Sequence, residues 1–200
     1  GKTMLQTVEH ETRPRPAWSI VWLHGLGADG NDFAPIVPEL VREGWPGIRF
    51  VFPHAKVRPV TINGGAPMRA WYDIVSLQID QRADESGVRD SIREVEALIA
   101  RERDRGVPAE RTILAGFSQG GAIALAAALR REAGLAGVVA LSTYLPLANA
   151  TKDESTVAGR KTPVFMAHGS QDPVVPQALV THFHGGDGAN TLRHCQDAAG

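Results

Sequence analysis

A short glycine-rich motif at residues 116–120 constrains the fold of this chain more than any other feature. The sequence Gly-Phe-Ser-Gln-Gly follows the apolar run 113–115 and precedes a second apolar run, 121–125. A strand therefore has to turn sharply into a helix at Ser118, and the glycines two positions either side let neighbouring elements approach such a strained turn. The pattern predicts a strand–turn–helix unit with Ser118 at its tip.

The same turn places chemistry at one end of a sheet. The Ser118 hydroxyl would project above the strand end, and the amide of Gln119 would point to where an oxyanion forms. The motif therefore predicts a nucleophile together with one half of an oxyanion hole. A purely structural turn serine is the alternative, but the flanking strand and helix patterns favour the catalytic interpretation.

Length and charge narrow the class of protein. Two hundred residues, 43% hydrophobic and 22% charged, are typical of one globular domain, so residues 1–200 are predicted to form a single domain. A net charge of −1 and the lack of a basic stripe predict no nucleic-acid partner. The longest apolar block, 122–129, is too short to cross a bilayer, which predicts no stable membrane insertion.

The N-terminal residues and the cysteine content predict a cytoplasmic location. Residues 1–16 are polar and proline-bearing and lack the apolar core of a signal sequence, and the single Cys195 cannot form an internal disulfide. Residues 1–3 ahead of Met4 are interpreted as an expression remnant.

Segments with strand and helix patterns alternate along the chain, which is the order of an α/β protein. The most economical fold is a central sheet of four or five parallel strands with helices on both faces. Residues 53–83 are expected to form a long irregular loop of functional importance. Strands are predicted at 19–23, 48–52, 113–115, 138–141 and 164–167, and helices at 31–43 and 88–99.

Two further segments follow predicted strands, at the sheet edge where open α/β sheets bind their ligands. After the first strand, the glycines of His24-Gly25-Leu26-Gly27 allow a bend that aims the Leu26 amide at Ser118 as a second oxyanion donor. His24 itself is interpreted as a structural histidine. After the last strand, Asp172 lies on a turn in the chain order serine, then acid, and would orient a catalytic histidine. A turn-capping aspartate is the alternative for Asp172.

Taken together, these motifs resemble the phospholipase/carboxylesterase family, which includes bacterial carboxylesterases and acyl-protein thioesterases. The similarity covers residues 18–179 and is carried by the segments 23–27, 61–65, 71–73, 116–121 and 168–176. The resemblance implies an α/β-hydrolase fold with Ser118 as nucleophile, Asp172 as acid, and the Leu26 and Gln119 amides as the oxyanion hole. It also implies that Trp71 lines the acyl-binding groove, although core packing is the alternative for this side chain.

The C-terminal segment departs from the family pattern. The family places its catalytic histidine about thirty residues after the acid, beyond an amphipathic helix and a strand, whereas residues 180–200 here show neither pattern. His194 is the remote candidate for the missing base. A metal site in this tail is not expected, because the spacing of its histidine, aspartate and cysteine residues (His182, His184, Asp187, His194 and Cys195) matches no familiar zinc pattern.

Three functional hypotheses follow. The first is a serine carboxylesterase that cleaves small-molecule esters of short to medium acyl chains through an acyl-enzyme, with no metal or organic cofactor. The second is a thioesterase that removes acyl groups from protein cysteines. The third is a catalytically impaired binding protein that keeps the groove but lacks the triad histidine. A homodimer is common in similar proteins, and the sequence leaves this point open.

Overall fold

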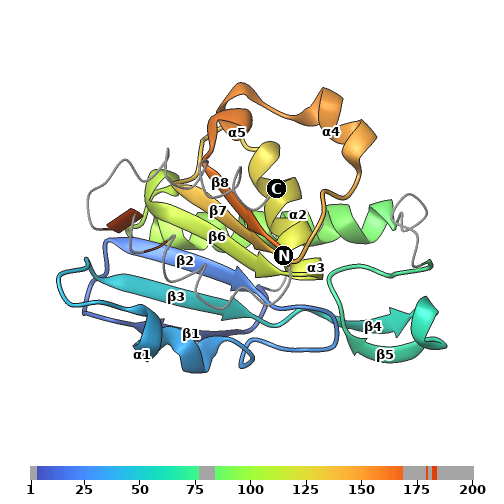
Figure 1. The fold of residues 1–200 in the computed structure, drawn as a ribbon, viewed down its shortest axis with the longest axis horizontal. Helices are drawn as coiled ribbons and strands as arrows, with labels where there is room; N and C mark the ends of the chain where they lie inside the picture. The colour runs from blue at the N-terminus through green and yellow to red at the C-terminus, as the bar shows by residue number, and fades with distance from the viewer. Residues whose placement is uncertain (1–3, 77–83, 169–178, 180–181, 184–200) are drawn as a thin grey trace.

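A six-stranded sheet forms the centre of the fold, in the strand order β1-β3-β2-β6-β7-β8 (Figure 1). The computed structural model describes residues 4–76, 84–168, 179 and 182–183. Five neighbouring strands run parallel, and β1 pairs with β3 in the antiparallel direction. The mostly parallel sheet predicted from the sequence is confirmed. The strands are β1 Thr7–Glu11, β2 Trp18–Leu23, β3 Ile48–Pro53, β6 Thr112–Phe117, β7 Gly137–Leu141 and β8 Val164–Ala167.

Both faces of the sheet are covered, as a parallel sheet of continuous apolar runs requires. Val21 and Leu23 of β2 pack in a core cluster with α2, Glu85–Asp104, and α3, Gln119–Leu129. The alternate residues Ile20 and Trp22 belong to a second cluster on the other face. The predicted helix at 88–99 is confirmed within α2, which begins where Asp84 caps it by accepting the Gly87 N–H at 3.0 Å.

The predicted helix at 31–43 is wrong in length. The chain forms only the 3₁₀ turn η1, Ala34–Ile36, followed by the single turn α1, Val37–Leu40, and Val41 is already extended. Each turn carries a proline at its start, Pro35 and Pro38. Proline favours the first turn of a helix but cannot continue one, so the apolar spacing of this segment is used in two short turns.

Part of the loop predicted at 53–83 is an ordered hairpin. Strands β4, Val57–Val60, and β5, Ala66–Arg69, pair antiparallel and are joined by the 3₁₀ turn η2, Thr61–Asn63. Gly64 and Gly65 both have positive φ, 70° and 79°, which allows the chain to reverse there. Residues 77–83 lie outside the described ranges.

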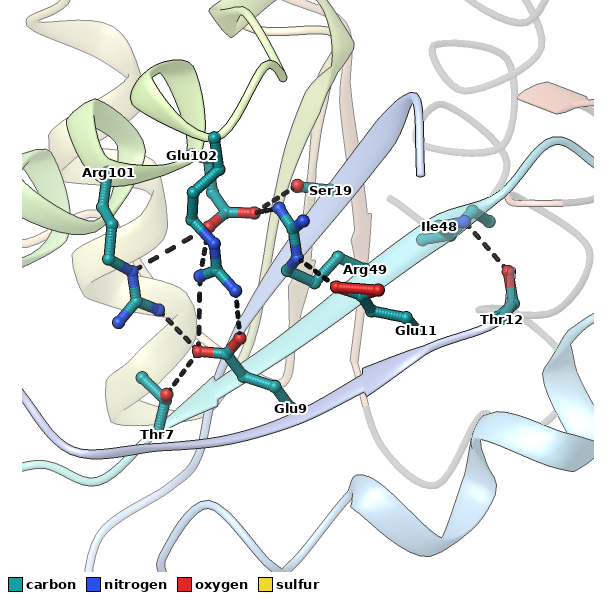
Figure 2. Close-up of polar contacts among 10 residues, drawn as sticks. Thr7, Glu9, Glu11, Thr12, Ser19, Ile48, Arg49, Arg101 and Glu102 are labelled. Carbon is teal, nitrogen blue, oxygen red and sulfur yellow. Dashed lines mark hydrogen bonds and ion pairs between the residues drawn. The ribbon is translucent and has the colours of Figure 1, made fainter. Parts of the chain in front are cut away.

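The antiparallel edge strand β1 was not predicted, because its residues are polar. Glu9 forms ion pairs with Arg101 at 2.7 Å and with Arg105 at 2.6 Å, so β1 is tied to α2 as well as to β3 (Figure 2). Next to these ion pairs, the fully buried Glu102 binds Arg49 at 2.8 Å. Charged partners thus hold this strand in addition to its pairing with β3 and the packing of Val8 on the core.

The C-terminal part of the described chain contains short helices. These are α4, Ala148–Glu154, and α5, Val157–Lys161, which connect β7 to β8. Leu179, His182 and Phe183 are also helical; Leu179 is buried, and Phe183 packs on the same core cluster as β2 and on Trp45. The prediction that residues 180–200 carry no helical stripe stays a prediction, because most of this segment lies outside the described residues. No helix within the described ranges has the length and apolar character needed to cross a membrane.

Candidate active site

Ser118 occupies the sharp turn between β6 and α3 that the sequence predicted. Its backbone has a positive φ of 55° with ψ −118°, a costly conformation for a residue other than glycine. The Ser118 N–H donates to the Leu141 carbonyl at 2.8 Å, and the Ser118 carbonyl accepts from Thr143 Oγ1 at 2.6 Å. These bonds from the end of β7 hold the strained turn.

The two glycines of the motif are required by close backbone approach. A Cβ on Gly116 would lie 2.5 Å from the backbone of Gly120, and a Cβ on Gly120 would lie 2.3 Å from the Leu23 carbonyl. No side chain fits at either position without moving the main chain. The turn is thus packed directly against the end of β2.

The side chain of Gln119 is buried and ties this turn to a distant segment. Gln119 Oε1 accepts the Trp71 N–H at 2.6 Å, and its Nε2 donates to the Tyr72 carbonyl at 2.7 Å. Its backbone N–H belongs to the first residue of α3, where helical N–H groups lack intrahelical acceptors.

The loop after β2 brings His24 and Leu26 to the same end of the sheet. His24 is buried, its Nδ1 donates to the Gly25 carbonyl at 2.7 Å, and its Nε2 accepts the Ala55 N–H at 3.0 Å. Burial lowers the pKa of His24 below its ordinary value of 6.5. Both ring nitrogens are engaged by backbone groups, which agrees with the structural role predicted for this histidine.

A cavity of about 480 Å³ opens beside Ser118. It brings together three residues predicted from the sequence, Ser118, Leu26 and Gln119. The remaining lining residues come from the hairpin, from the segment after it and from the loop after β7; they are Ile62, Asn63, Tyr72, Ile74 and Tyr144. The wall is therefore mostly apolar with a few polar groups, as small-molecule sites commonly are.

The hairpin tip is fastened to the cavity by Asp73. Thr61 donates its N–H to Asp73 Oδ1 at 2.7 Å and its hydroxyl to Oδ2 at 2.5 Å. The Ile62 N–H donates to the Ile74 carbonyl at 2.9 Å. These contacts hold Ile62 and Asn63 against the cavity.

Tyr144 reaches the cavity from a strained loop. Its hydroxyl lies 2.7 Å from that of Tyr72, across the cavity wall. Two residues near it, Ser142 and Leu147, have positive φ of 49° and 54°. Sequence reasoning missed Tyr144 as a site residue, although its position directly after β7, at the carboxyl end of a parallel strand, could have indicated it.

The structure corrects the expectation for Trp71. This side chain is 0% exposed and is absent from the cavity lining, and its neighbour Tyr72 is the residue that reaches the cavity. The indole Nε1 donates to the His24 carbonyl at 2.8 Å, and the ring packs on that of His24. The core-packing alternative therefore holds for Trp71.

The predicted acid and base lie outside the described residues. This applies to Asp172, to the candidate base His194, and to His184, Asp187 and Cys195 of the tail. Among the described residues, no histidine lines the Ser118 cavity. In the same part of the chain, no cluster of three or more histidine, cysteine or acidic residues could hold a metal ion.

The parallel sheet, the serine with positive φ between strand and helix, and the cavity at the carboxyl ends of the strands define the class of protein. It is an α/β-hydrolase of the serine hydrolase type. The sequence profile of the phospholipase/carboxylesterase family matches residues 5–187, so the chain belongs to that family.

Named relatives agree with this assignment. Acyl-protein thioesterase 1 of Cryptococcus neoformans is 39% identical over 160 residues, which cover 78% of this chain and 67% of that protein. Among solved structures, Arabidopsis thaliana SOBER1 matches with a TM-score of 0.71 at 27% identity, covering 90% of this chain and 96% of the other. Zea mays acyl-protein thioesterase 2 matches with a TM-score of 0.68 at 28% identity, covering 96% and 85%. The family is thus one of carboxylesterases, and two of these relatives are named acyl-protein thioesterases.

Proposed function

We propose that this protein hydrolyses carboxylic esters of short to medium acyl chains, with Ser118 as the nucleophile. The observation that carries the proposal is the strained Ser118 at the edge of a 480 Å³ cavity, beside the amides of Leu26 and Gln119. In the part of the chain that the structure describes, neither of these two backbone N–H groups donates a hydrogen bond to another protein group. Two N–H groups of this kind can stabilise a tetrahedral oxyanion.

The reaction proceeds in two steps. The Ser118 Oγ attacks the ester carbonyl while a histidine takes its proton, and the tetrahedral intermediate expels the alcohol, which receives that proton. Water then attacks the acyl-enzyme with the same histidine as base, releasing the carboxylic acid and free Ser118. Asp172 would orient the histidine and stabilise its charged form. Side chains and backbone amides complete this chemistry without a cofactor.

A thioesterase acting on acylated protein cysteines is the second candidate. The names of the fungal and maize relatives favour it, since both are acyl-protein thioesterases. The reaction uses the same Ser118, with a thiol leaving in place of the alcohol. The two activities therefore differ in the leaving group and in the molecule that carries the acyl chain. A direct competition between an ester and a thioester substrate distinguishes the two activities.

The third candidate is a protein that binds acyl compounds without turning them over. It is favoured only by the observation that the cavity wall has no histidine among the described residues. A cytoplasmic location and a homodimer remain predictions under all three proposals.

One set of assays tests these proposals. Hydrolysis of p-nitrophenyl acetate and butyrate is measured for the parent, Ser118→Ala and His194→Ala, together with labelling by a serine-directed fluorophosphonate. Turnover and labelling that are lost in Ser118→Ala support the esterase, and loss in His194→Ala identifies the base. A parent no faster than Ser118→Ala, with no labelling, contradicts the enzyme proposals and favours the binding protein.

A further inference from the structure

The two proposed oxyanion donors lie on separate loops whose relative position needs a physical cause. Strand pairing between β2 and β6 ends at the pair Leu23 and Gly116. Leu26 lies three residues beyond one member of that pair and Gln119 three residues beyond the other. Ladder hydrogen bonds therefore do not fix the distance between the two amides, and other contacts have to do so.

Trp71 makes a hydrogen bond to each of these loops. Its backbone N–H donates to the Gln119 side chain at 2.6 Å, and its indole Nε1 donates to the His24 carbonyl at 2.8 Å. The residue is 0% exposed, and its ring packs on the His24 ring with the centroids 5.3 Å apart. One buried residue thus bridges the turn that carries Gln119 and the loop that carries Leu26.

Neighbouring residues extend the bridge in both directions. The Arg69 carbonyl accepts the Gly27 N–H at 2.9 Å, so Leu26 lies between two anchored residues, His24 and Gly27. On the other side, the Tyr72 carbonyl accepts from Gln119 Nε2 at 2.7 Å.

The bridging segment is itself held by helix α2. The Ser91 hydroxyl donates to the Trp71 carbonyl, and both residues are buried. The segment 69–72 therefore rests on the helix and presents hydrogen-bonding groups to both loops. Because its anchor lies in the core, it does not depend on a bound substrate for its position.

We propose that Trp71 is a positioning residue that sets the geometry of the oxyanion hole. This inference rests on the proposed function of Ser118. The indole contact with the His24 carbonyl fixes the loop that carries the Leu26 N–H. The contact with the Gln119 side chain fixes the turn that carries the Gln119 backbone N–H. An oxyanion exists only in the transition state and the tetrahedral intermediate, so a misplaced donor lowers kcat and leaves KM nearly unchanged.

The test compares Trp71→Phe with Trp22→Phe. Both tryptophans are buried, but among the described residues the Trp22 indole N–H has no hydrogen-bond partner. The two changes therefore remove a similar ring volume, and only the first removes a bond to the oxyanion loop. We expect kcat for p-nitrophenyl butyrate to fall roughly 10- to 100-fold in Trp71→Phe, with KM within about twofold, because loss or misplacement of a donor has effects of this order.

Active enzyme is counted by fluorophosphonate titration, so that partial unfolding does not enter kcat. A trifluoromethyl ketone, whose adduct with Ser118 carries an oxyanion, should lose affinity in parallel with kcat. The proposal is overturned if kcat of Trp71→Phe stays within twofold of the parent or if Trp22→Phe loses as much kcat. It is also overturned if KM alone rises in Trp71→Phe, which would indicate that Trp71 contacts the substrate.

Two further measurements keep the proposal testable. If Trp71→Phe does not fold, the test uses 3-benzothienylalanine at position 71 instead. This residue keeps the ring shape of tryptophan and lacks the N–H, and the same residue at position 22 is the control. If the parent hydrolyses no ester, the esterase proposal fails, and amide hydrogen exchange alone decides. Faster exchange in peptides 23–28 and 117–122 of the position-71 variant than of the position-22 variant supports the bridge, and equal exchange refutes it.

Discussion

Removing the buried carboxylate of Glu102 should be among the most destabilising single changes in this protein. Glu102 is 0% exposed and accepts hydrogen bonds from Ser19 at 2.5 Å, Arg49 at 2.8 Å and Arg105 at 2.9 Å (Figure 2). The Glu102→Ala variant leaves the Arg49 guanidinium, 7% exposed, with Glu11 as its remaining ion-pair partner at 3.2 Å. Breaking a buried pair by deleting one partner costs roughly 3–5 kcal/mol, because the remaining charge stays out of water.

The magnitude can be tested by urea unfolding followed by tryptophan fluorescence. For a domain of this size, roughly 3–5 kcal/mol corresponds to a fall in Tm of about 6–20 °C. Glu96→Ala is the matched control, since it makes the same change on the same helix, pairs with Arg131 and is 40% exposed, so its cost should stay below about 1 kcal/mol. Equal losses in the two variants would refute the reasoning, and an isosteric Glu102→Gln variant separates lost charge from lost volume.

Three further predictions concern acid stability, the nucleophile turn and the cavity wall. Stability should be full above about pH 6.5 and decrease below it, because burial lowers the pKa of His24 and protonation breaks its bond from Ala55. A second loss of at most about 2 kcal/mol in the free energy of unfolding should follow between pH 4.5 and 2. Burial acts to raise the pKa of Glu9, but its bonds to Arg105 and Thr7 and the charge of Arg101 lower that pKa to about 2. Urea titrations at pH 8, 6, 4 and 3 check both losses, and a flat profile contradicts them. Gly120→Ala should abolish fluorophosphonate labelling, since its Cβ would lie 2.3 Å from the Leu23 carbonyl; normal labelling would show that the turn can move. Asp73→Ala should raise KM for p-nitrophenyl butyrate several-fold with kcat little changed, because the hairpin tip loses both bonds from Thr61, and an unchanged KM would argue against this wall.

The parallel core and the nucleophile turn could be predicted from sequence because each has a strong local signal. Buried strands such as 48–52 are continuous apolar runs, and the glycine pattern around Ser118 has one steric explanation. The segment 31–43 was predicted incorrectly because its apolar spacing is helical while Pro35 and Pro38 divide it. Periodicity reports which side chains are buried, but not whether the backbone between them can continue a helix.

The parts of the fold and of the site that sequence did not reveal depend on contacts between distant residues. The edge strand β1 is stabilised by Arg101 and Arg105, more than 90 residues away, so its own residues carry no strand pattern. The family resemblance implied that Trp71 lines the groove, whereas its neighbour Tyr72 takes that position. Trp71 and Tyr72 lie in a bend after β5, and sequence alone does not say which of two neighbouring side chains faces the cavity.

The charged attachment of β1 also bears on the order in which the chain folds during synthesis. Arg105 follows Glu9 by 96 residues, so at about 5–20 residues per second the ribosome completes this partner roughly 5–20 seconds after the strand itself. During that interval β1 can pair with β3, but its glutamates remain without the arginines of α2. A polar segment can wait in water without aggregating, which an apolar edge strand could not do. We therefore expect the ion pairs that tie β1 to α2 to form only after α2 has been synthesised, although β6, β7 and β8 follow later still in the chain.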